Sequence, residues 1–134
     1  MKIVIDSNII FSAIISPWGK TAELIFLKDF EFFSARTLEK ELLEHKNELL
    51  KKSTLSENEF ELLREILLNK ITFFEEEDLH DYILKAKEIC PDKDDVAFFA
   101  VCLLKNLPLW SNDKKLKNQT VVQVISIEEL VKMV

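Results

Sequence analysis

Short apolar runs alternate with helix-like segments along the whole chain, and this alternation restricts the fold more than any other feature. The apolar runs cover residues 1–5, 31–35, 71–74, 108–111 and 121–125. Strands separated by helices form βαβ units, whose strands lie parallel in one sheet with helices on both faces. The sequence therefore predicts an α/β fold, a three-layer α/β/α sandwich with a central, mainly parallel sheet of about five strands.

Helix signals fill the intervals between these runs. Ser56 with Glu59, and Ser126 with Glu129, have the spacing of a capping box, in which each side chain accepts a hydrogen bond from a backbone N–H at the helix start. We expect helices at residues 9–15, 21–30, 37 to about 50, 56–68, 78–89 and 94–105, a turn or short helix at 112–116, and a terminal helix after Ser126. The acidic residues 75–78 are interpreted as a solvated loop.

The 134 residues, 48% of them hydrophobic, are typical of one globular domain. Single cores usually close at about 100 to 200 residues, and no linker, low-complexity tract or internal repeat divides the chain. We therefore expect residues 1–134 to form a single domain. No apolar run reaches the roughly 18 residues needed to cross a bilayer, and no charged-then-apolar leader precedes the first strand. We expect a cytoplasmic protein that does not contact a membrane.

The single glycine, Gly19, excludes two large classes of nucleotide-binding protein. Phosphate-cradling loops and dinucleotide-binding fingerprints each require two or three glycines. The two cysteines and two histidines are too few and too scattered for a structural zinc site. Any metal ion must therefore be held mainly by oxygen ligands.

Five acidic residues stand where one edge of a parallel sheet brings chain segments together. Asp6 follows the first predicted strand and Asp113 follows the fourth, while Asp92 and Asp95 are three residues apart near a helix start. Glu41 lies in the first turns of the helix predicted from residue 37. Each aspartate alone could serve only as a helix cap, but ligands of open parallel sheets bind beyond the carboxyl ends of the strands. Carboxylates that converge there either hold protons or bind a cation.

The net charge of −6 makes a bound cation important for any nucleic-acid partner. Proteins that hold nucleic acid through a basic surface carry an excess of lysine and arginine, which this chain lacks. Oxygen ligands with open coordination positions suit Mg²⁺ or Mn²⁺, which accept phosphate oxygens beside protein carboxylates. A metal ion at the acidic edge would supply the positive charge that the surface does not.

The acidic residues and their neighbours resemble the PIN domain, a family of small metal-dependent ribonucleases that includes the toxins of many bacterial and archaeal toxin-antitoxin pairs. Residues 3–8, an apolar strand followed by Asp, a small residue and Asn, resemble the opening of the family and carry Asp6. Asp95, with an alanine five positions later, resembles the third family acid, and Asp113, two positions after a serine, the fourth. The likeness covers nearly the whole chain.

The second family acid resembles Glu41 in the run at residues 37–42, and Glu39 and Glu44 remain as alternative registers. The resemblance implies a phosphodiesterase that uses Mg²⁺ or Mn²⁺ and an activated water to hydrolyse RNA. The implied catalytic and metal-binding residues are Asp6, Glu41, Asp95 and Asp113, with Asp92 as a further metal ligand.

Other residues receive supporting roles from the same resemblance. Asn8 and Ser111 resemble groups that orient carboxylates or water. Lys114 and Lys115 follow the fourth acid and are interpreted as contacts to RNA phosphates, with a solvated helix face as the alternative. The family also implies an antitoxin partner and a homodimer, for which the apolar segments 60–68 and 82–89 are candidates.

Two other function classes stay open beside the ribonuclease. One is a binding module of the same fold that recognises RNA or protein without cutting it. The other is a phosphotransfer protein, either a receiver domain or a haloacid-dehalogenase-like phosphatase, because both place an aspartate after the first strand. The phosphatase needs a second aspartate two residues after the first, where this chain has Asn8. The acidic residues therefore favour the nuclease.

Overall fold

Five parallel strands form the centre of the molecule, in the order β3-β2-β1-β4-β5. The computed structural model describes residues 1–27 and 29–134. The strands are β1 (Lys2–Ile5), β2 (Glu31–Ala35), β3 (Ile71–Phe74), β4 (Leu109–Trp110) and β5 (Val124–Ile125), and all four strand pairs are parallel. The predicted α/β fold with a five-stranded parallel sheet is confirmed.

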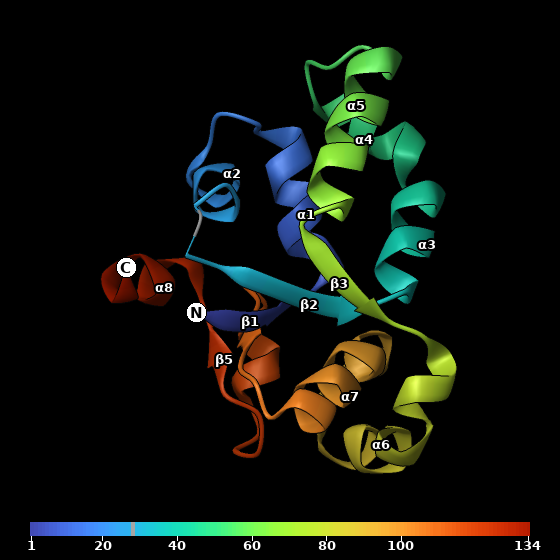
Figure 1. The fold of residues 1–134 in the computed structure, drawn as a ribbon, viewed down its shortest axis with the longest axis vertical. Helices are drawn as coiled ribbons and strands as arrows, with labels where there is room; N and C mark the ends of the chain where they lie inside the picture. Colours follow the sequence, from blue (N-terminus) through green and yellow to red (C-terminus); the bar gives the residue numbers. More distant parts are fainter. Residues whose placement is uncertain (28) are drawn as a thin grey trace.

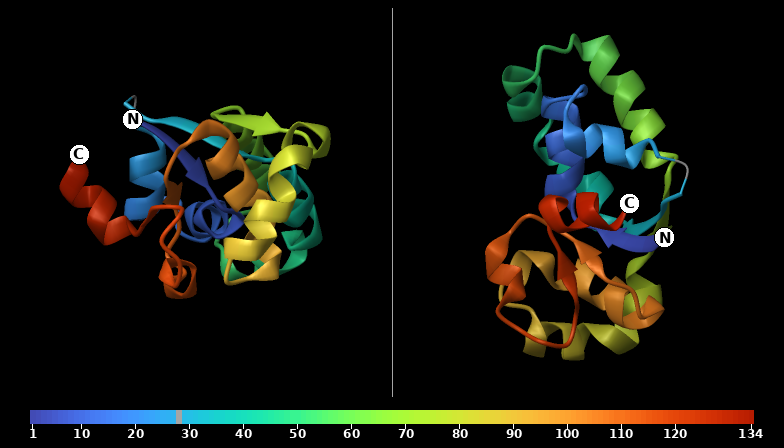
Figure 2. Two further views of the ribbon diagram at one scale, coloured as in Figure 1. Left: turned by 90° about the horizontal axis from the view of Figure 1, so that it is seen from below. Right: turned by 90° about the vertical axis from the view of Figure 1, so that its left-hand side faces the viewer.

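Helices cover both faces of this sheet (Figure 1). They are α1 (Ser7–Ile15), α2 (Lys20–Ile25), α3 (Thr37–Glu44), α4 (Lys46–Lys52), α5 (Glu57–Leu68), α6 (Glu76–Ile89), α7 (Val96–Lys105) and α8 (Ile127–Met133), with 3₁₀ turns η1 (Lys93–Asp95) and η2 (Lys114–Lys117). Helices α1 to α5 lie on one side of the sheet and α6 and α7 on the other. The two further views in Figure 2 show the same separation, and the two chain ends lie near each other.

The order of the strands places a switch point beside β1. The chain moves outward from β1 to β2 and β3, and then returns to the opposite side of β1 to form β4 and β5. Val4 of β1 is aligned with Phe33 of β2 and with Leu109 of β4. In open parallel sheets, ligands bind beyond the carboxyl ends of the strands at such a point. The residues that follow β1 and β4 are therefore the first place to look for a site.

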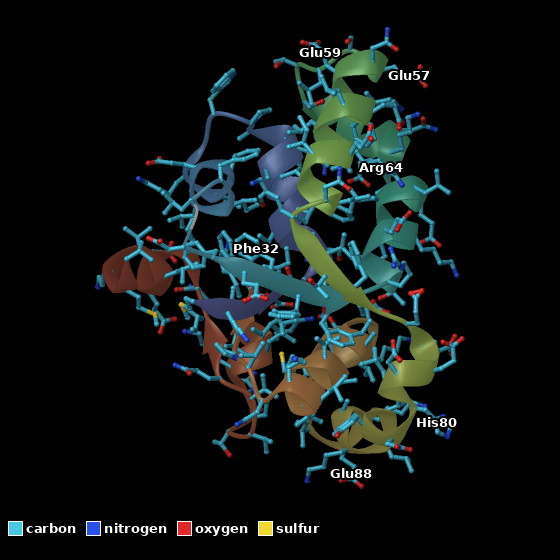
Figure 3. All side chains as sticks on the ribbon, viewed as in Figure 1. Phe32, Glu57, Glu59, Arg64, His80 and Glu88 are labelled. Atoms are coloured by element: carbon cyan, nitrogen blue, oxygen red, sulfur yellow. The ribbon has the colours of Figure 1, made fainter. Side chains whose placement is uncertain are left out.

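The core is built from the apolar strands and the inner faces of the helices. Ile3, Val4 and Ile5 of β1 are fully buried, as are Phe98 and Phe99 of α7. Figure 3 shows Phe32 in the middle of the molecule, on β2, and its ring centroid lies 6.2 Å from that of Trp110 on β4. A continuous core under both strands holds the carboxyl ends of β1 and β4 in fixed relative positions.

The structure corrects two predicted helices. The helix expected at residues 21–30 ends at Ile25, because the chain must turn at Phe26 to bring Glu31 beside Lys2 in the sheet; residue 28 of that prediction lies outside the described residues. The helix expected from residue 37 to about 50 is two helices, α3 and α4, which meet at His45. The apolar spacing of Leu42 and Leu49 runs through this break and therefore conceals it.

Residues 75–78 are a helix start and not the predicted loop. Glu75 is the N-cap residue of α6: its carbonyl accepts a hydrogen bond from the Asp78 N–H at 3.1 Å, and its N–H donates to the Asp78 carboxylate at 2.9 Å. The two serine capping boxes, at Ser56 with Glu59 and at Ser126 with Glu129, are present as predicted. Glu75 was not recognised because helix caps are usually Ser, Thr, Asp or Asn.

The last two strands are shorter than predicted. Leu109 and Trp110 alone form β4, and β5 pairs with them over Val124 and Ile125. The Gln119 side chain donates to the Val122 carbonyl at 2.8 Å and accepts from the Val122 N–H at 2.9 Å, which holds the preceding residues in a loop. Within the described residues, none of the helices has both the length and the apolar character that a membrane span requires.

Candidate functional site

Asp6 lies at the carboxyl end of β1 and caps the start of α1. Its side chain is 1% exposed, and Oδ1 accepts a hydrogen bond from the Ile9 N–H at 3.1 Å. The other oxygen, Oδ2, is buried and has no hydrogen-bond partner in residues 1–27 and 29–134. A buried polar atom without a partner is unfavourable unless a ligand satisfies it. Asp6 therefore offers one oxygen to a ligand while the other is held by the helix.

Asp92, Asp95 and Asp113 form a compact cluster. One carboxylate oxygen of each lies within 4.8 Å of the other two, and all three residues are half-buried. Local hydrogen bonds fix two of them: Asp92 accepts from the Asp94 N–H at 3.0 Å and Asp113 accepts from the Lys115 N–H at 3.0 Å. The turn before α7 and the turn after β4 thus present acidic side chains to one another. We call these three residues the aspartate triad.

Burial and mutual repulsion change the protonation of this site. Burial and then the charges of Asp6, Asp92 and Asp113 together raise the pKa of Asp95 to about 7. Burial likewise raises the pKa of Asp6 to about 6, although the neighbouring Ser111 hydroxyl and Ile9 N–H favour the charged form. Asp6 is therefore part of the same electrostatic cluster as the aspartate triad. A bound cation or retained protons relieve the repulsion between carboxylates in such a cluster.

Glu41 lies beside the start of α1. Its carboxylate accepts a hydrogen bond from the Ser7 hydroxyl, and its charge acts on both Asp6 and Asp95. Burial raises the pKa of Glu41, while the Ser7 hydroxyl and then His45 act in the opposite direction. Glu41 is thus brought to the cluster from a fourth segment of the chain.

Glu39 and Glu44, the two alternatives to Glu41 as the second acid, have different surroundings. Glu39 forms ion pairs with Arg36 at 2.9 Å and with Arg64 at 3.5 Å, so its charge is already balanced. Glu44 is exposed at the last residue of α3. The geometry therefore favours Glu41 over Glu39 and Glu44.

The two residues expected to orient the acids are placed differently. Ser111 is buried at the end of β4, and its hydroxyl oxygen accepts a hydrogen bond from the Asp113 N–H at 3.2 Å. The Ser111 hydroxyl favours the charged form of Asp6, although it forms no hydrogen bond to Oδ2 of Asp6. Asn8 is exposed on α1 and lines a hollow with Phe11 and His45. Within the described part of the chain, Asn8 forms no hydrogen bond to an acidic side chain.

The lysines after Asp113 are also placed differently from one another. The ammonium of Lys115 lies 3.3 Å from Oδ2 of Asp92. The hydrogen bond from the Asp94 N–H, and then Lys115, lower the pKa of that aspartate. Lys117 forms an ion pair with Glu129. Lys114 is exposed and lines a hollow of about 590 Å³ that also contains Asp113. Of these three lysines, Lys114 is the one without an ion pair in the described residues.

Two contacts that support the acidic site could not be predicted from the sequence. Ser7 stands between Asp6 and Asn8 and could be read only as a small residue, yet its hydroxyl binds Glu41. The Cys90 thiol donates a hydrogen bond to the Asp92 carbonyl at 3.0 Å, which ties the end of α6 to the loop carrying the triad. The partners are 34 positions apart in the first case, so no local pattern could indicate the contact.

Comparison with solved structures shows which proteins have a similar fold. The fold is similar to the crystal structure of VapBC2 from Rickettsia felis bound to a DNA fragment from their promoter, with a TM-score of 0.70 and 15% sequence identity over 94% of this chain and 98% of that chain. It is also similar to the crystal structure of PAE2754 from Pyrobaculum aerophilum, with a TM-score of 0.63 and 11% identity over 99% of this chain and 88% of that chain.

Sequence comparison identifies the family. No curated protein matches the chain. The family model of the PIN domain matches residues 4–130, and this range includes all five acidic residues of the site. The likeness to the two crystal structures establishes the fold, and the match over almost the whole length establishes the family. The chain belongs to the PIN domain family.

Proposed function

We propose that the chain is a metal-dependent endoribonuclease that hydrolyses RNA phosphodiester bonds. The observation that carries the proposal is the meeting of acidic side chains from four separate segments at the switch point of the sheet. Asp6 follows β1, Glu41 belongs to α3, Asp95 precedes α7 and Asp113 follows β4. Helix capping explains single aspartates, but it does not explain why they raise one another's pKa.

The side chains fit a hard divalent cation such as Mg²⁺ or Mn²⁺. Ionised carboxylates are hydrogen-bond acceptors only, and the unpartnered Oδ2 of Asp6 is the atom that most requires a cation. Asp6, Glu41, Asp92, Asp95 and Asp113 are the proposed ligands, with oxygen donors of the kind these ions prefer. When bound, such an ion lowers the pKa of a coordinated water and stabilises the charge that develops on phosphate oxygens.

The protein residues supply orientation. The Ile9 N–H fixes the Asp6 carboxylate, and the Ser7 hydroxyl fixes Glu41. Ser111 accepts a hydrogen bond from the Asp113 N–H and thereby holds the turn that presents Asp113. Fixed carboxylates need no reorganisation when a substrate arrives, which is the general source of electrostatic catalysis.

Lysines beside the acids bring positive charge to the RNA. We propose that Lys114, which has no ion pair in the described residues, contacts a phosphate next to the cleaved bond. Lys115 orients Asp92 and adds to the local positive charge. A strand that crosses the acidic site would therefore leave it on the side of η2. Asn8, which is exposed on α1, has no assigned role in this proposal.

The test is cleavage of a mixed RNA pool by purified protein with Mn²⁺, with EDTA, and with Asp95→Asn in place of the wild type. Cutting that requires both the metal and Asp95 supports the nuclease. Asp81→Asn is the matched control, because Asp81 is an exposed aspartate on α6 away from the acids. An RNA pool left intact by protein that still binds Mn²⁺ favours the catalytically silent binding module of the same fold.

We further propose that the nuclease is a toxin restrained by an antitoxin protein, because the family includes such toxins. Expression of the wild-type chain alone should then arrest growth, whereas Asp95→Asn should not. Normal growth with active nuclease in the cell would contradict the toxin role without contradicting the nuclease.

A homodimer is proposed from the outer faces of two helices. Leu62 and Ile66 of α5 are 62% and 41% exposed, and Leu84 of α6 is 77% exposed. Apolar side chains of this size are favourable to bury against a second chain. Light scattering of the wild type and of Leu62→Glu would show whether α5 forms the contact.

A further inference from the structure

We propose that a hollow next to the acidic site binds a guanine base of the RNA strand. The proposal rests on the nuclease function proposed above and specifies its substrate. The hollow has a volume of about 580 Å³ and lies between the start of α3 and the first turns of α6. This volume is within the range of sites that take small ligands, roughly 300 to 1,000 Å³. We call it the base hollow.

The base hollow adjoins the acidic site along the carboxyl edge of the sheet. Lys40, on its rim, directly precedes Glu41, and Ala97, in its wall, follows Asp95 by two residues. The hydroxyl of Ser34, in β2, donates to the carbonyl of Ile5 in β1 at 2.8 Å, so the ends of these strands are fixed side by side. The base hollow, lined by Ala35 at the end of β2 and Phe74 at the end of β3, therefore lies at the same edge of the sheet as the acids.

The walls of the base hollow are apolar. They include Phe74 at the end of β3, Leu79 and Ile83 on α6, and Ala97 on α7. Phe74 and Ile83 are only partly buried, so part of the apolar surface remains open to solvent. Single-stranded RNA is recognised by placing unstacked bases against aromatic and aliphatic side chains. The walls therefore suit the flat faces of a base.

The acidic side chains on the rim disfavour a phosphate inside the base hollow. Arg36 is neutralised by Glu39 and Glu75, at 2.9 Å each. Glu76 and Glu77 carry negative charge and have no ion pair in the part of the chain that the structure describes. Two carboxylates repel a phosphate. A neutral base avoids this repulsion and leaves the Lys40 ammonium available for the phosphate that joins it to the acidic site.

The carboxylates of Glu76 and Glu77 also select among bases. An ionised carboxylate accepts hydrogen bonds and cannot donate them. The Watson–Crick edge of guanine presents two adjacent donors, N1–H and the N2 amino group. Adenine and cytosine each pair one amino donor with a ring acceptor, and uracil has a single N3–H donor between two carbonyl acceptors. The chemistry of the rim therefore favours guanine over the other three bases.

The first test is sequencing of the cut ends produced from a randomised RNA pool with Mn²⁺. We expect guanine at one position beside the cut at about tenfold over adenine, the discrimination of a good paired contact. The double substitution Glu76→Gln with Glu77→Gln should reduce this ratio of guanine to adenine to about one. Glu88→Gln is the control, because Glu88 lies near the other end of the same helix (Figure 3) and pairs with Lys85.

The second test needs neither cleavage nor metal. In EDTA, guanosine should shift the methyl resonances of Leu79 and Ile83, and adenosine should shift them about tenfold more weakly at equal concentration. Ile83→Trp fills the hollow and should abolish the shifts; thermal unfolding shows whether this variant is folded. The glutamine double variant reports on the same site if it is not.

The outcomes separate the two proposals. If RNA is cut without base preference and guanosine leaves the methyl resonances unmoved, the base hollow is overturned and the nuclease stands. If RNA remains intact but guanosine shifts Leu79 and Ile83, the nuclease is overturned and the base hollow stands. A base preference that persists in the glutamine double variant also overturns the assignment of guanine to this hollow.

Discussion

The hydroxyl of Ser7 donates a hydrogen bond to the carboxylate of Glu41, which lies 34 positions later in the chain. Ser7 is the first residue of α1, directly after Asp6, and Glu41 is in α3. The bond therefore links the helix that begins at Asp6 to the helix that supplies the second acid. Burial raises the pKa of Glu41, and the Ser7 hydroxyl counteracts this by favouring the charged form. Ser7 orients Glu41 and favours its ionised form.

Replacement of Ser7 should therefore weaken metal binding without unfolding the protein. We expect Ser7→Ala to lower the affinity for Mn²⁺ by about tenfold, the lower end of the range for residues that orient a metal ligand. Isothermal titration calorimetry with Mn²⁺ measures the change. Ser12→Ala on the exposed side of α1 is the control. Equal affinities for Ser7→Ala and Ser12→Ala would contradict the role of Ser7.

The buried carboxyl of Asp6 predicts an unusual pH dependence of stability in the metal-free protein. Burial raises its pKa from 3.8 to about 6, so between these values the folded state holds a proton that the unfolded state has lost. The contribution of Asp6 to the free energy of unfolding is therefore complete below about pH 4 and is lost as the pH rises through 6. The full change corresponds to about 3 kcal/mol.

Chemical denaturation in EDTA at several pH values measures this contribution. The wild-type free energy of unfolding, minus that of Asp6→Asn, should fall between about pH 4 and pH 7, because the asparagine does not titrate. The same subtraction for the exposed control Asp81→Asn should stay nearly constant with pH. A difference for Asp6→Asn that rises with pH would show that Asp6 is stabilised in its charged form.

Metal binding should reverse this destabilisation. Mn²⁺ at a hundredfold excess over its dissociation constant should raise the free energy of unfolding of the wild type by about 2.7 kcal/mol. Asp6→Asn should abolish most of the gain, since it removes the unpartnered Oδ2 atom. Thermal unfolding with and without Mn²⁺ measures the shift, with Asp81→Asn as the control. Equal shifts for wild type and Asp6→Asn would contradict the metal site.

Local patterns predicted most of the fold. The five strands were found because each is a short apolar run, and the caps at Ser56 and Ser126 follow from the spacing of one serine and one glutamate. The cap at Glu75 was missed because glutamate is an unusual capping residue. The end of α2 at Ile25 was missed because the limit is set by the pairing of β1 with β2, which is a tertiary constraint.

The acidic site was predictable to the same extent. Asp6 and Asp113 follow strands, so the geometry of a parallel sheet places them at one edge. The choice of Glu41 over Glu39 depends on the ion pairs of Glu39 with Arg36 and Arg64, which sequence spacing does not reveal. The pairing of Lys115 with Asp92 is likewise a contact between segments 23 positions apart.

The three lysines of η2 should differ in their effect on RNA binding because two of them are already engaged. Lys115 is held by Asp92 and Lys117 by Glu129, so a phosphate must displace a carboxylate to reach either. Lys114 is exposed beside Asp113 and can meet a phosphate directly. Counterion release then gives each phosphate contact to single-stranded RNA a slope of about −0.7 in log affinity against log salt concentration.

Lys114→Gln should therefore reduce the magnitude of this slope by about 0.7 for single-stranded RNA bound to the Asp95→Asn protein, which does not cut its ligand. Lys115→Gln should reduce the slope less, because the Lys115 ammonium is already paired with Asp92. Lys51→Gln, at an exposed lysine of α4, is the control. Fluorescence anisotropy of a labelled RNA at four salt concentrations measures the slopes. A slope that Lys114→Gln leaves equal to that of the Asp95→Asn protein alone would contradict the contact between Lys114 and a phosphate, and would mean that RNA leaves the acidic site by another path.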